Sequence, residues 1–242
     1  METVLIPSPQ MTYERKYIEY FKDFDWSTAT KEDCVQFAQA FGFPETGMSV
    51  NEIALIYDIL EAKRPKIIVE LGRNYGCSTR ISLQYIIRHG GTLYSWDLKH
   101  WPGFIQKMNE NGYSFVGCDD EDTFVGKWIA TDGSNLPGNV WLRVAHSIKA
   151  PVWRDIELNG VDFLLIDTEH GLEHALGEYM RWREYLKAGS FVAFHDSELA
   201  GPKRAIEMVK EVEANNYGDR LIREYKNEHI DGFGIHVLEW KG

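Results

Sequence analysis

The fold of this chain can be worked out from residues 68–82, IVELGRNYGCSTRIS. An apolar run ends at Glu70, a turn containing Gly72 and Gly76 follows, and a Ser-Thr pair is suited to the first turn of a helix. A buried strand, a glycine-containing turn and a helix in this order begin many doubly wound α/β sheets. In such sheets ligands lie beyond the carboxyl ends of the strands, so this turn is a candidate binding element.

From Lys66 onward, short apolar runs alternate with segments of helical spacing. The predicted strands are Ile67–Leu71, Thr92–Trp96, Val140–Val144, Phe163–Ile166, Phe191–Phe194, Leu221–Tyr225 and Phe233–Leu238. The predicted helices are Ser78–Arg88, Trp101–Asn111, Leu172–Leu186 and Pro202–Ala214. Apolar strands that alternate with helices favour a mostly parallel sheet covered on both faces. We therefore predict an α/β protein with a Rossmann-like, doubly wound sheet.

Two regions lie outside this alternation. Helical patterns before Pro65 occur at Tyr13–Phe24, at Lys31–Phe41 and after the capping-box pattern Ser49–Glu52. We predict residues 1–64 as an N-terminal helical extension, serving as a lid or a dimer face, and residues 65–242 as the Rossmann-like domain. The second region, Tyr113–Gly138, is longer than an ordinary connection and contains an acidic run, which is typical of a lid or a flexible solvated loop.

Composition excludes several classes of protein. The 242 residues include 26 Lys and Arg against 37 Asp and Glu, and the resulting net charge of -11 disfavours nucleic acid as a partner. Three cysteines without C-x-x-C spacing predict neither a disulfide framework nor a cysteine-based zinc site. No apolar stretch approaches the ~18 residues of a membrane span, and the N-terminus does not resemble a signal peptide. We expect a soluble cytoplasmic protein.

The glycine turn indicates a ligand without a pyrophosphate. Its spacing is G-x-x-x-G, and Asn74 stands where the G-x-G-x-x-G pattern of dinucleotide enzymes has its middle glycine. Gly72 and Gly76 are predicted to let a ligand approach the backbone closely. Glu70 at the strand tip is suited to attract an ammonium group, and Asp97 at the next strand tip is suited to accept hydrogen bonds from ribose hydroxyls. The expected ligand is a nucleoside that carries an amino acid group.

A second group of polar residues follows two later strands. Asp167 ends one strand, His170 comes three residues later, and the next strand ends in His195 and Asp196. Adjacent parallel strands bring the two carboxylates to one edge of the sheet, where they repel each other unless one is protonated or a cation lies between them. Mg²⁺ favours such oxygen ligands, and a nitrogen ligand from His195 favours a transition metal. The competing interpretation is that both acids cap the helices that follow.

The first group resembles the cofactor motifs of class I S-adenosylmethionine-dependent methyltransferases. The segments that carry the resemblance are VELGRNYGCST and SWD. By this resemblance, residues around the methionine part of the cofactor are Glu70, Gly72, Asn74 and Ser78. Asp97 would hold the ribose, and His146 and Ser147 fall where the family contacts adenine.

The second group resembles the metal-dependent O-methyltransferases of the catechol and macrolide-sugar types, and the related cephalosporin hydroxylase-like group. Their pattern is D-G-D-H-S-Y followed by P-G-G and H-D, and this chain has DTEHGL, KAG and HD. Thr168 and Glu169 replace the glycine and the second aspartate. The resemblance implies methyl transfer to a small-molecule hydroxyl, with Asp167, His195 and Asp196 holding a divalent metal such as Mg²⁺. In that mechanism His170 removes the hydroxyl proton, since its unperturbed pKa of ~6.5 suits a base near neutral pH.

Two alternatives stay open from the sequence. A metal-dependent hydroxylase- or hydrolase-like enzyme would keep the metal site without methyl transfer. A non-catalytic nucleoside-binding protein would keep only the nucleoside pocket. The expected partner is a small hydroxylated molecule, with neither a membrane nor nucleic acid involved, and the formation of homo-oligomers is left open.

Overall fold

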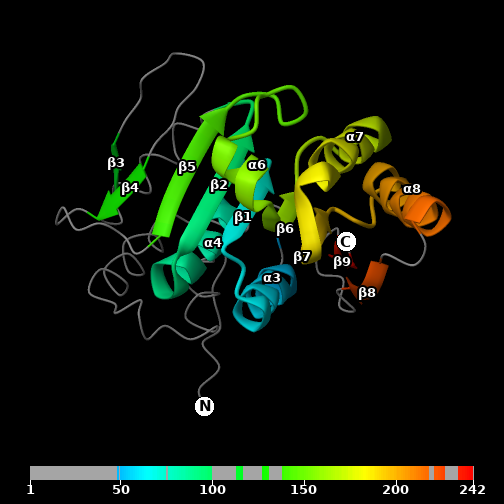
Figure 1. Cartoon of the computed structure of the whole chain (residues 1–242), viewed down its shortest axis with the longest axis horizontal. Helices are drawn as coiled ribbons and strands as arrows, with labels where there is room; N and C mark the ends of the chain where they lie inside the picture. Colours follow the sequence, from blue (N-terminus) through cyan, green and yellow to red (C-terminus); the bar gives the residue numbers. More distant parts are fainter. Residues whose placement is uncertain are drawn as a thin grey trace, which may run out of the picture.

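A computed structural model describes residues 48, 50–74, 76–99, 113–116, 127–130, 138–217, 221–226 and 234–241. Its centre is a seven-stranded sheet with the order β5-β2-β1-β6-β7-β9-β8 (Figure 1). The strands of this sheet are β1 (Ile67–Leu71), β2 (Gly91–Asp97), β5 (Gly138–Val144), β6 (Val161–Ile166), β7 (Leu186–His195), β8 (Leu221–Lys226) and β9 (Ile235–Trp240).

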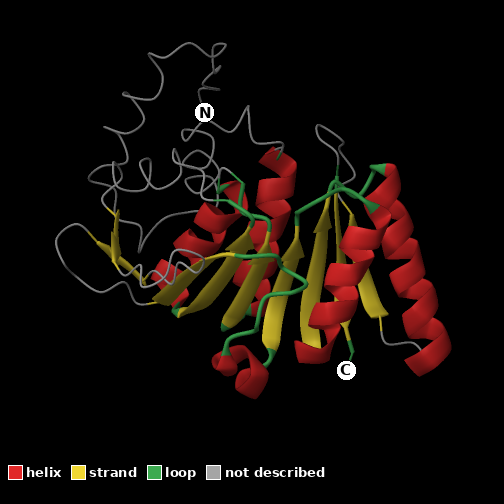
Figure 2. Cartoon of the chain, turned by 90° about the horizontal axis from the view of Figure 1, so that it is seen from above, coloured by secondary structure: helices red, strands yellow, loops and turns green. Residues whose placement is uncertain are grey.

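Helices cover both faces of the sheet (Figures 1 and 2). One face carries α3 (Val50–Lys63) and α4 (Cys77–His89), and the other carries α6 (Arg154–Asn159), α7 (Leu172–Trp182) and α8 (Ala200–Tyr217). A short 3-10 helix, Arg183–Tyr185, follows α7. All five residues of β1 are buried, as expected for a strand packed on both faces. The predicted doubly wound α/β sheet is therefore confirmed.

The direction of the strands also agrees with the prediction of a mostly parallel sheet. Strands β1, β2, β5, β6 and β7 pair in parallel. Strand β9 runs antiparallel to both β7 and β8, so β8 has the same direction as the rest and β9 alone is reversed.

Successive residues of each central strand point to opposite faces of the sheet, so each strand contributes to the core on both faces. Val69 and Leu71 belong to the apolar cluster that also contains Trp96 and Trp182, on the face covered by α6, α7 and α8. The intervening residue, Glu70, faces α4 instead, because successive side chains of a strand point to opposite faces. The sheet therefore places a fully buried carboxylate under the first turn of α4.

Elements too short for a clear period were not predicted. Helix α6 has only six residues, and an antiparallel pair, β3 (Tyr113–Val116) and β4 (Lys127–Ala130), lies within the region expected to be a lid or loop. The predicted helices Tyr13–Phe24, Lys31–Phe41 and Trp101–Asn111 lie outside the described residues, as does Ser49 of the predicted capping box. Among the helices of the described ranges, none is both long and apolar enough to cross a membrane.

The register of the sheet brings the polar strand ends together. Leu71 pairs with both Trp96 and Ile166, and Ile166 pairs with Phe194. The residues that follow these positions therefore lie along one edge of the sheet, and they are Gly72, Asp97, Asp167 and His195.

Candidate active site

The glycine turn after β1 lies directly against the loop after β6. Gly72 has φ +88°, and a Cβ atom at this position would lie 1.8 Å from the carbonyl oxygen of Asp167. Two backbone hydrogen bonds hold this arrangement: the Gly72 N–H donates to the Trp96 carbonyl at 2.9 Å, and the Asp167 N–H donates to the Leu71 carbonyl at 2.8 Å. Glycine is required here both for its left-handed backbone and for the missing side chain.

Asp97 fixes the far side of the same turn. Its Oδ2 accepts hydrogen bonds from the backbone N–H groups of Arg73 (2.9 Å) and Asn74 (2.7 Å), and its Oδ1 accepts one from Lys99 N–H (3.0 Å). Asn74 has φ +45°, a conformation in which its N–H points toward the carboxylate. A carboxylate has about four acceptor positions, and donors among the described residues occupy three of those of Asp97, which leaves one on Oδ1.

Glu70, predicted to attract an ammonium group, lies behind the glycine turn. The side chain is completely buried, and it accepts hydrogen bonds from three hydroxyls: Ser78 (2.5 Å) and Thr79 (2.7 Å) in the first turn of α4, and Ser95 (2.5 Å) in β2. Burial raises the pKa of Glu70, and the three hydroxyl donors oppose that rise. Glu70 and Ser78 therefore shape the turn from behind.

Gly76 ends the turn and begins α4. It has φ +83°, its N–H donates to the Arg73 carbonyl at 2.7 Å, and its own carbonyl accepts from Arg80 N–H at 3.1 Å. The first turn of α4 therefore starts at the same sheet edge as the turn, where free N–H groups of a helix favour electron-rich ligand atoms.

His146 and Ser147 follow β5, as predicted for the adenine side, but their side chains differ in orientation. The Ser147 hydroxyl is buried and donates to Glu178 of α7, so it points into the protein. The ring of His146 is half-buried, and its Nδ1 accepts a hydrogen bond from Ile148 N–H at 3.2 Å. Of this pair, His146 has the side chain that is partly accessible to a ligand.

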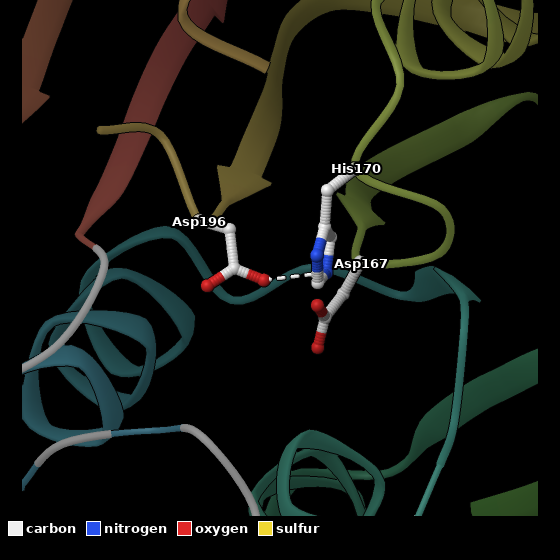
Figure 3. A group of neighbouring side chains, drawn as sticks. All are labelled: Asp167, His170 and Asp196. Atoms are coloured by element: carbon white, nitrogen blue, oxygen red, sulfur yellow. Dashed lines mark ion pairs between the residues drawn. The ribbon is translucent and has the colours of Figure 1, made fainter. Parts of the chain in front are cut away.

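Asp167, His170 and Asp196 come together at the ends of β6 and β7 (Figure 3). One ligand-type atom from each of the three lies within 4.8 Å of the others, and His170 Nε2 is 2.6 Å from Asp196 Oδ2. His170 is half-exposed, whereas Asp196 is buried. Burial and the neighbouring Asp196 raise the pKa of Asp167, and the charge of His195 acts in the opposite direction.

His195 lies among three carboxylates. Its Nδ1 lies 3.0 Å from Asp167 Oδ1 and 3.2 Å from Asp196 Oδ2, and its Nε2 lies 3.5 Å from Glu52 Oε2 in α3. Burial lowers the pKa of His195, but these three carboxylates outweigh burial and raise it well above its ordinary value. These contacts join His195 to both aspartates, and the three residues whose ligand-type atoms all lie within 4.8 Å of one another are Asp167, His170 and Asp196.

A family model described as a methyltransferase domain matches residues 69–197, more than half of the chain. The chain belongs to this methyltransferase family. The resemblance to class I S-adenosylmethionine-dependent methyltransferases that the sequence motifs indicated is thereby confirmed. The matched range includes the glycine turn and the group of Asp167, His170 and Asp196.

Individual proteins agree with this assignment. The proteins named Rhamnosyl O-methyltransferase from Mycobacterium tuberculosis (strain H37Rv) and Mycobacterium bovis are 23% identical over 191 residues, covering 74% of this chain and 69% of theirs. An O-methyltransferase from Bacillus cereus, solved in complex with SAH, has a TM-score of 0.54 at 14% identity and covers 93% of this chain and 97% of its own. An SAH-bound methyltransferase from Podospora anserina has a TM-score of 0.52 at 11% identity, over the full length of both chains. These structures share the fold of this methyltransferase.

Asp196, in the methyltransferase site, has a left-handed backbone. Its φ of +52° is uncommon for a residue other than glycine. Helix α8 begins close by, and a Cβ atom at Gly201 would lie 2.1 Å from the His170 carbonyl. The close approach of α8 fixes the backbone on both sides of the His170–Asp196 pair.

Two acidic residues of the site were not predicted from the sequence. Glu52 was interpreted as part of a capping box, yet its carboxylate faces His195 from α3. Glu178 was not singled out, although it is fully buried under the loops that follow β5 and β6. A signal for Glu178 does exist, because it lies on the same helical stripe as the buried residues Ala175, Tyr179 and Trp182.

Proposed function

We propose that this methyltransferase transfers the methyl group of S-adenosylmethionine to a hydroxyl of a small molecule. The observation that carries the proposal is the direct contact between the glycine turn at Gly72 and the loop that begins at Asp167. A cofactor held at the turn would therefore present its reactive end to His170 and Asp196. The named activity of the mycobacterial relatives supports oxygen as the atom that is methylated, and makes deoxysugars the first acceptors to screen.

The proposed cofactor contacts follow from the geometry of the turn. Backbone atoms of Gly72, Asn74 and Gly76 would contact the methionine part, because Glu70 and Ser78 are bonded to each other behind them. Asp97 would accept one ribose hydroxyl at its remaining acceptor position, while its other positions hold the turn. His146 would lie on the adenine side.

His170 is the proposed general base. A neutral imidazole that donates through Nε2 to Asp196 keeps its lone pair on Nδ1, and Asp196 fixes the orientation of the ring. When bound, S-adenosylmethionine supplies a methyl group on a positively charged sulfur. The cofactor would give its methyl group to the acceptor oxygen and keep the electron pair of the broken carbon–sulfur bond, and His170 Nδ1 would receive the hydroxyl proton. Alignment of the two reactants supplies much of the rate in such a displacement.

The same three residues fit a divalent metal. Asp167 and Asp196 offer carboxylate oxygens and His170 offers a nitrogen, a mixed set that suits Mg²⁺ less well than a transition metal. A bound metal would lower the pKa of the acceptor hydroxyl. With a metal bound, His170 would serve as a ligand rather than as the base, so the dependence of kcat on metal distinguishes these two roles of His170.

The test begins with calorimetric titration of S-adenosylmethionine and SAH into the protein, followed by mass analysis of hydroxylated acceptors. We expect binding in about the micromolar range and a product heavier than the acceptor by one methyl group. A product heavier by one oxygen atom, or failure of both nucleosides to bind, would refute the proposal.

The base is tested by His170→Ala, with His89→Ala as the matched control. We expect kcat to fall by about 10²–10⁴-fold in His170→Ala, with partial recovery at higher pH. His89 pairs with Glu61 at the far end of α4, so its variant should retain the wild-type kcat. Treatment with EDTA, followed by addition of Mg²⁺ or Mn²⁺, decides whether a metal takes part. Wild-type kcat in His170→Ala would assign the base to another residue.

A further inference from the structure

Helix α7 carries a buried acid on its apolar stripe. Glu178 is completely buried, and the other buried residues of this stripe are Ala175, Tyr179 and Trp182. Burying a carboxylate without partners is costly, so the structure must supply donors for both of its oxygens. Those donors come from two loops at the candidate active site.

The first loop, residues 145–150, follows β5 and is called the β5 loop. Its Ser147 hydroxyl donates to Glu178 Oε1, and its Ser147 carbonyl accepts from Trp182 Nε1 at 3.2 Å. The second loop, residues 167–171, follows β6 and is called the β6 loop. Its Thr168 hydroxyl donates to Glu178 Oε2 at 2.7 Å. One carboxylate therefore bonds both loops.

His174, one helical turn before Glu178, touches the same two loops. Its Nε2 lies 3.3 Å from Glu178 Oε1, and its Nδ1 lies 3.5 Å from Glu169 Oε2 in the β6 loop. The rings of His174 and His146 in the β5 loop have centroids 5.4 Å apart. The interaction of the His174 ring with the Glu178 carboxylate raises the pKa of His174, and burial acts in the opposite direction. His174 therefore contacts both loops and Glu178 at once.

The contacts from the β6 loop come from the two residues that depart from the D-G-D-H pattern. Thr168 replaces glycine and bonds Glu178, and Glu169 replaces aspartate and faces His174. A glycine at position 168 would have no hydroxyl to donate. Thr168 with Glu178 and Glu169 with His174 thus form two contacts between the β6 loop and α7.

We propose that His174 and Glu178 form a clamp of positioning residues that holds the β5 loop and the β6 loop in one fixed relation. The β5 loop contributes His146 to the adenine side, and the β6 loop contributes Asp167 and His170 to the reacting side. The clamp keeps the two ends of the site aligned, so that a bound cofactor meets the base in a productive geometry. Its kinetic consequences rest on the proposed function, whereas its structural consequences do not.

The test compares Glu178→Met with Glu213→Met. Glu213 of α8 is also fully buried, accepts a hydrogen bond from the Tyr179 hydroxyl at 3.0 Å and pairs with Arg183 at 3.2 Å, so its contacts join α7 to α8. In Glu178→Met we expect amide hydrogen exchange in both loops to become about tenfold faster. We expect a higher KM for S-adenosylmethionine and a lower kcat in the same variant. Glu213→Met should leave exchange in the two loops at the wild-type rate.

Three further variants separate the clamp from a general loss of structure. Glu178→Gln should recover much of the protection, because the Ser147 and Thr168 hydroxyls can accept from an amide as well as donate to its oxygen. Ser147→Ala should raise KM for S-adenosylmethionine more than it lowers kcat. Thr168→Val should lower kcat more than it raises KM. If Glu178→Met does not fold, these two variants test the clamp in its place. Unchanged exchange in both loops of Glu178→Met, or equal acceleration in Glu213→Met, would overturn the clamp. Absence of cofactor binding in the wild-type protein would overturn the proposed function, while the exchange result would still decide the clamp.

Discussion

Replacement of Gly72 by alanine tests the contact between the glycine turn and the β6 loop. The added Cβ atom would lie 1.8 Å from the Asp167 carbonyl oxygen, a backbone atom that cannot rotate away. The turn and the β6 loop would have to separate by roughly 1.2 Å before that distance reached 3.0 Å, below which real Cβ contacts are essentially never seen. Such a separation would also stretch the bond from Asp167 N–H to the Leu71 carbonyl.

The expected cost has two parts. A left-handed backbone costs a residue other than glycine about 1–2 kcal/mol. Forcing an extra carbon into a packed contact costs about 1–3 kcal/mol more. The sum of ~2–5 kcal/mol is a large part of the ~5–15 kcal/mol by which folded proteins are usually stable. Gly72→Ala should therefore unfold at a markedly lower urea concentration than the wild-type protein.

Gly189→Ala is the matched control, because Gly189 has nearly the same dihedral angle, φ +86°, with no atom within 4 Å of a Cβ. It should cost only the backbone part, ~1–2 kcal/mol. The assay is urea unfolding followed by far-ultraviolet circular dichroism, with SAH titration on the folded variants. Equal destabilisation by the two variants would refute the close contact at Gly72, since only that contact distinguishes them.

Two more predictions concern stability away from the sheet edge. Gly177→Ala should stabilise the protein by up to ~1 kcal/mol, because alanine is the better helix former. The atom nearest to the added Cβ is Ile148 Cδ1 at 3.1 Å, the end of a flexible side chain that can move aside. A melting temperature below that of the wild type would show that Ile148 cannot move. Burial raises the pKa of Glu61, but hydrogen bonding with His89 and the charge of Arg88 outweigh it and hold that pKa below its usual value. A lowered carboxylate pKa gives stability that is complete above about pH 4.5 and is lost as the pH falls through the folded-state pKa. Glu61→Gln should therefore be less stable than wild type at pH 7, and the gap in urea midpoint should close in acid; a gap independent of pH would contradict this assignment.

The sheet and its functional edge could be predicted because they depend on local patterns. Runs such as IIVEL are apolar at four of five positions and lack the polar alternation of a half-exposed strand, which identifies strands buried on both faces. Parallel strands end at one edge, so Gly72, Asp167 and Asp196 could be placed near one another without any knowledge of side-chain contacts. The ribbon of β3 and β4 could not be predicted, since four-residue strands are too short to show a period.

The surroundings of His195 depend on residues that lie far from it in the sequence. His195 is the last residue of β7, and alternation along the strand turns its side chain toward the face that carries α3. There it meets Glu52, from a helix that precedes it by more than a hundred residues. No spacing rule predicts that pair, so the contact of His195 with a third carboxylate could not be predicted from the sequence.

The burial of Glu178, unlike that of Glu52, can be predicted from the sequence. Ala175, Tyr179 and Trp182 define the apolar stripe of α7, and Glu178 lies within it at spacings of three, one and four residues. A carboxylate on such a stripe must find donors inside the protein, because acids are almost never fully buried without partners. The loops at the amino end of α7 follow β5 and β6, and they supply the hydroxyls of Ser147 and Thr168. A charged residue on an apolar helix face beside strand ends is therefore a specific signal for a residue that holds a site in place.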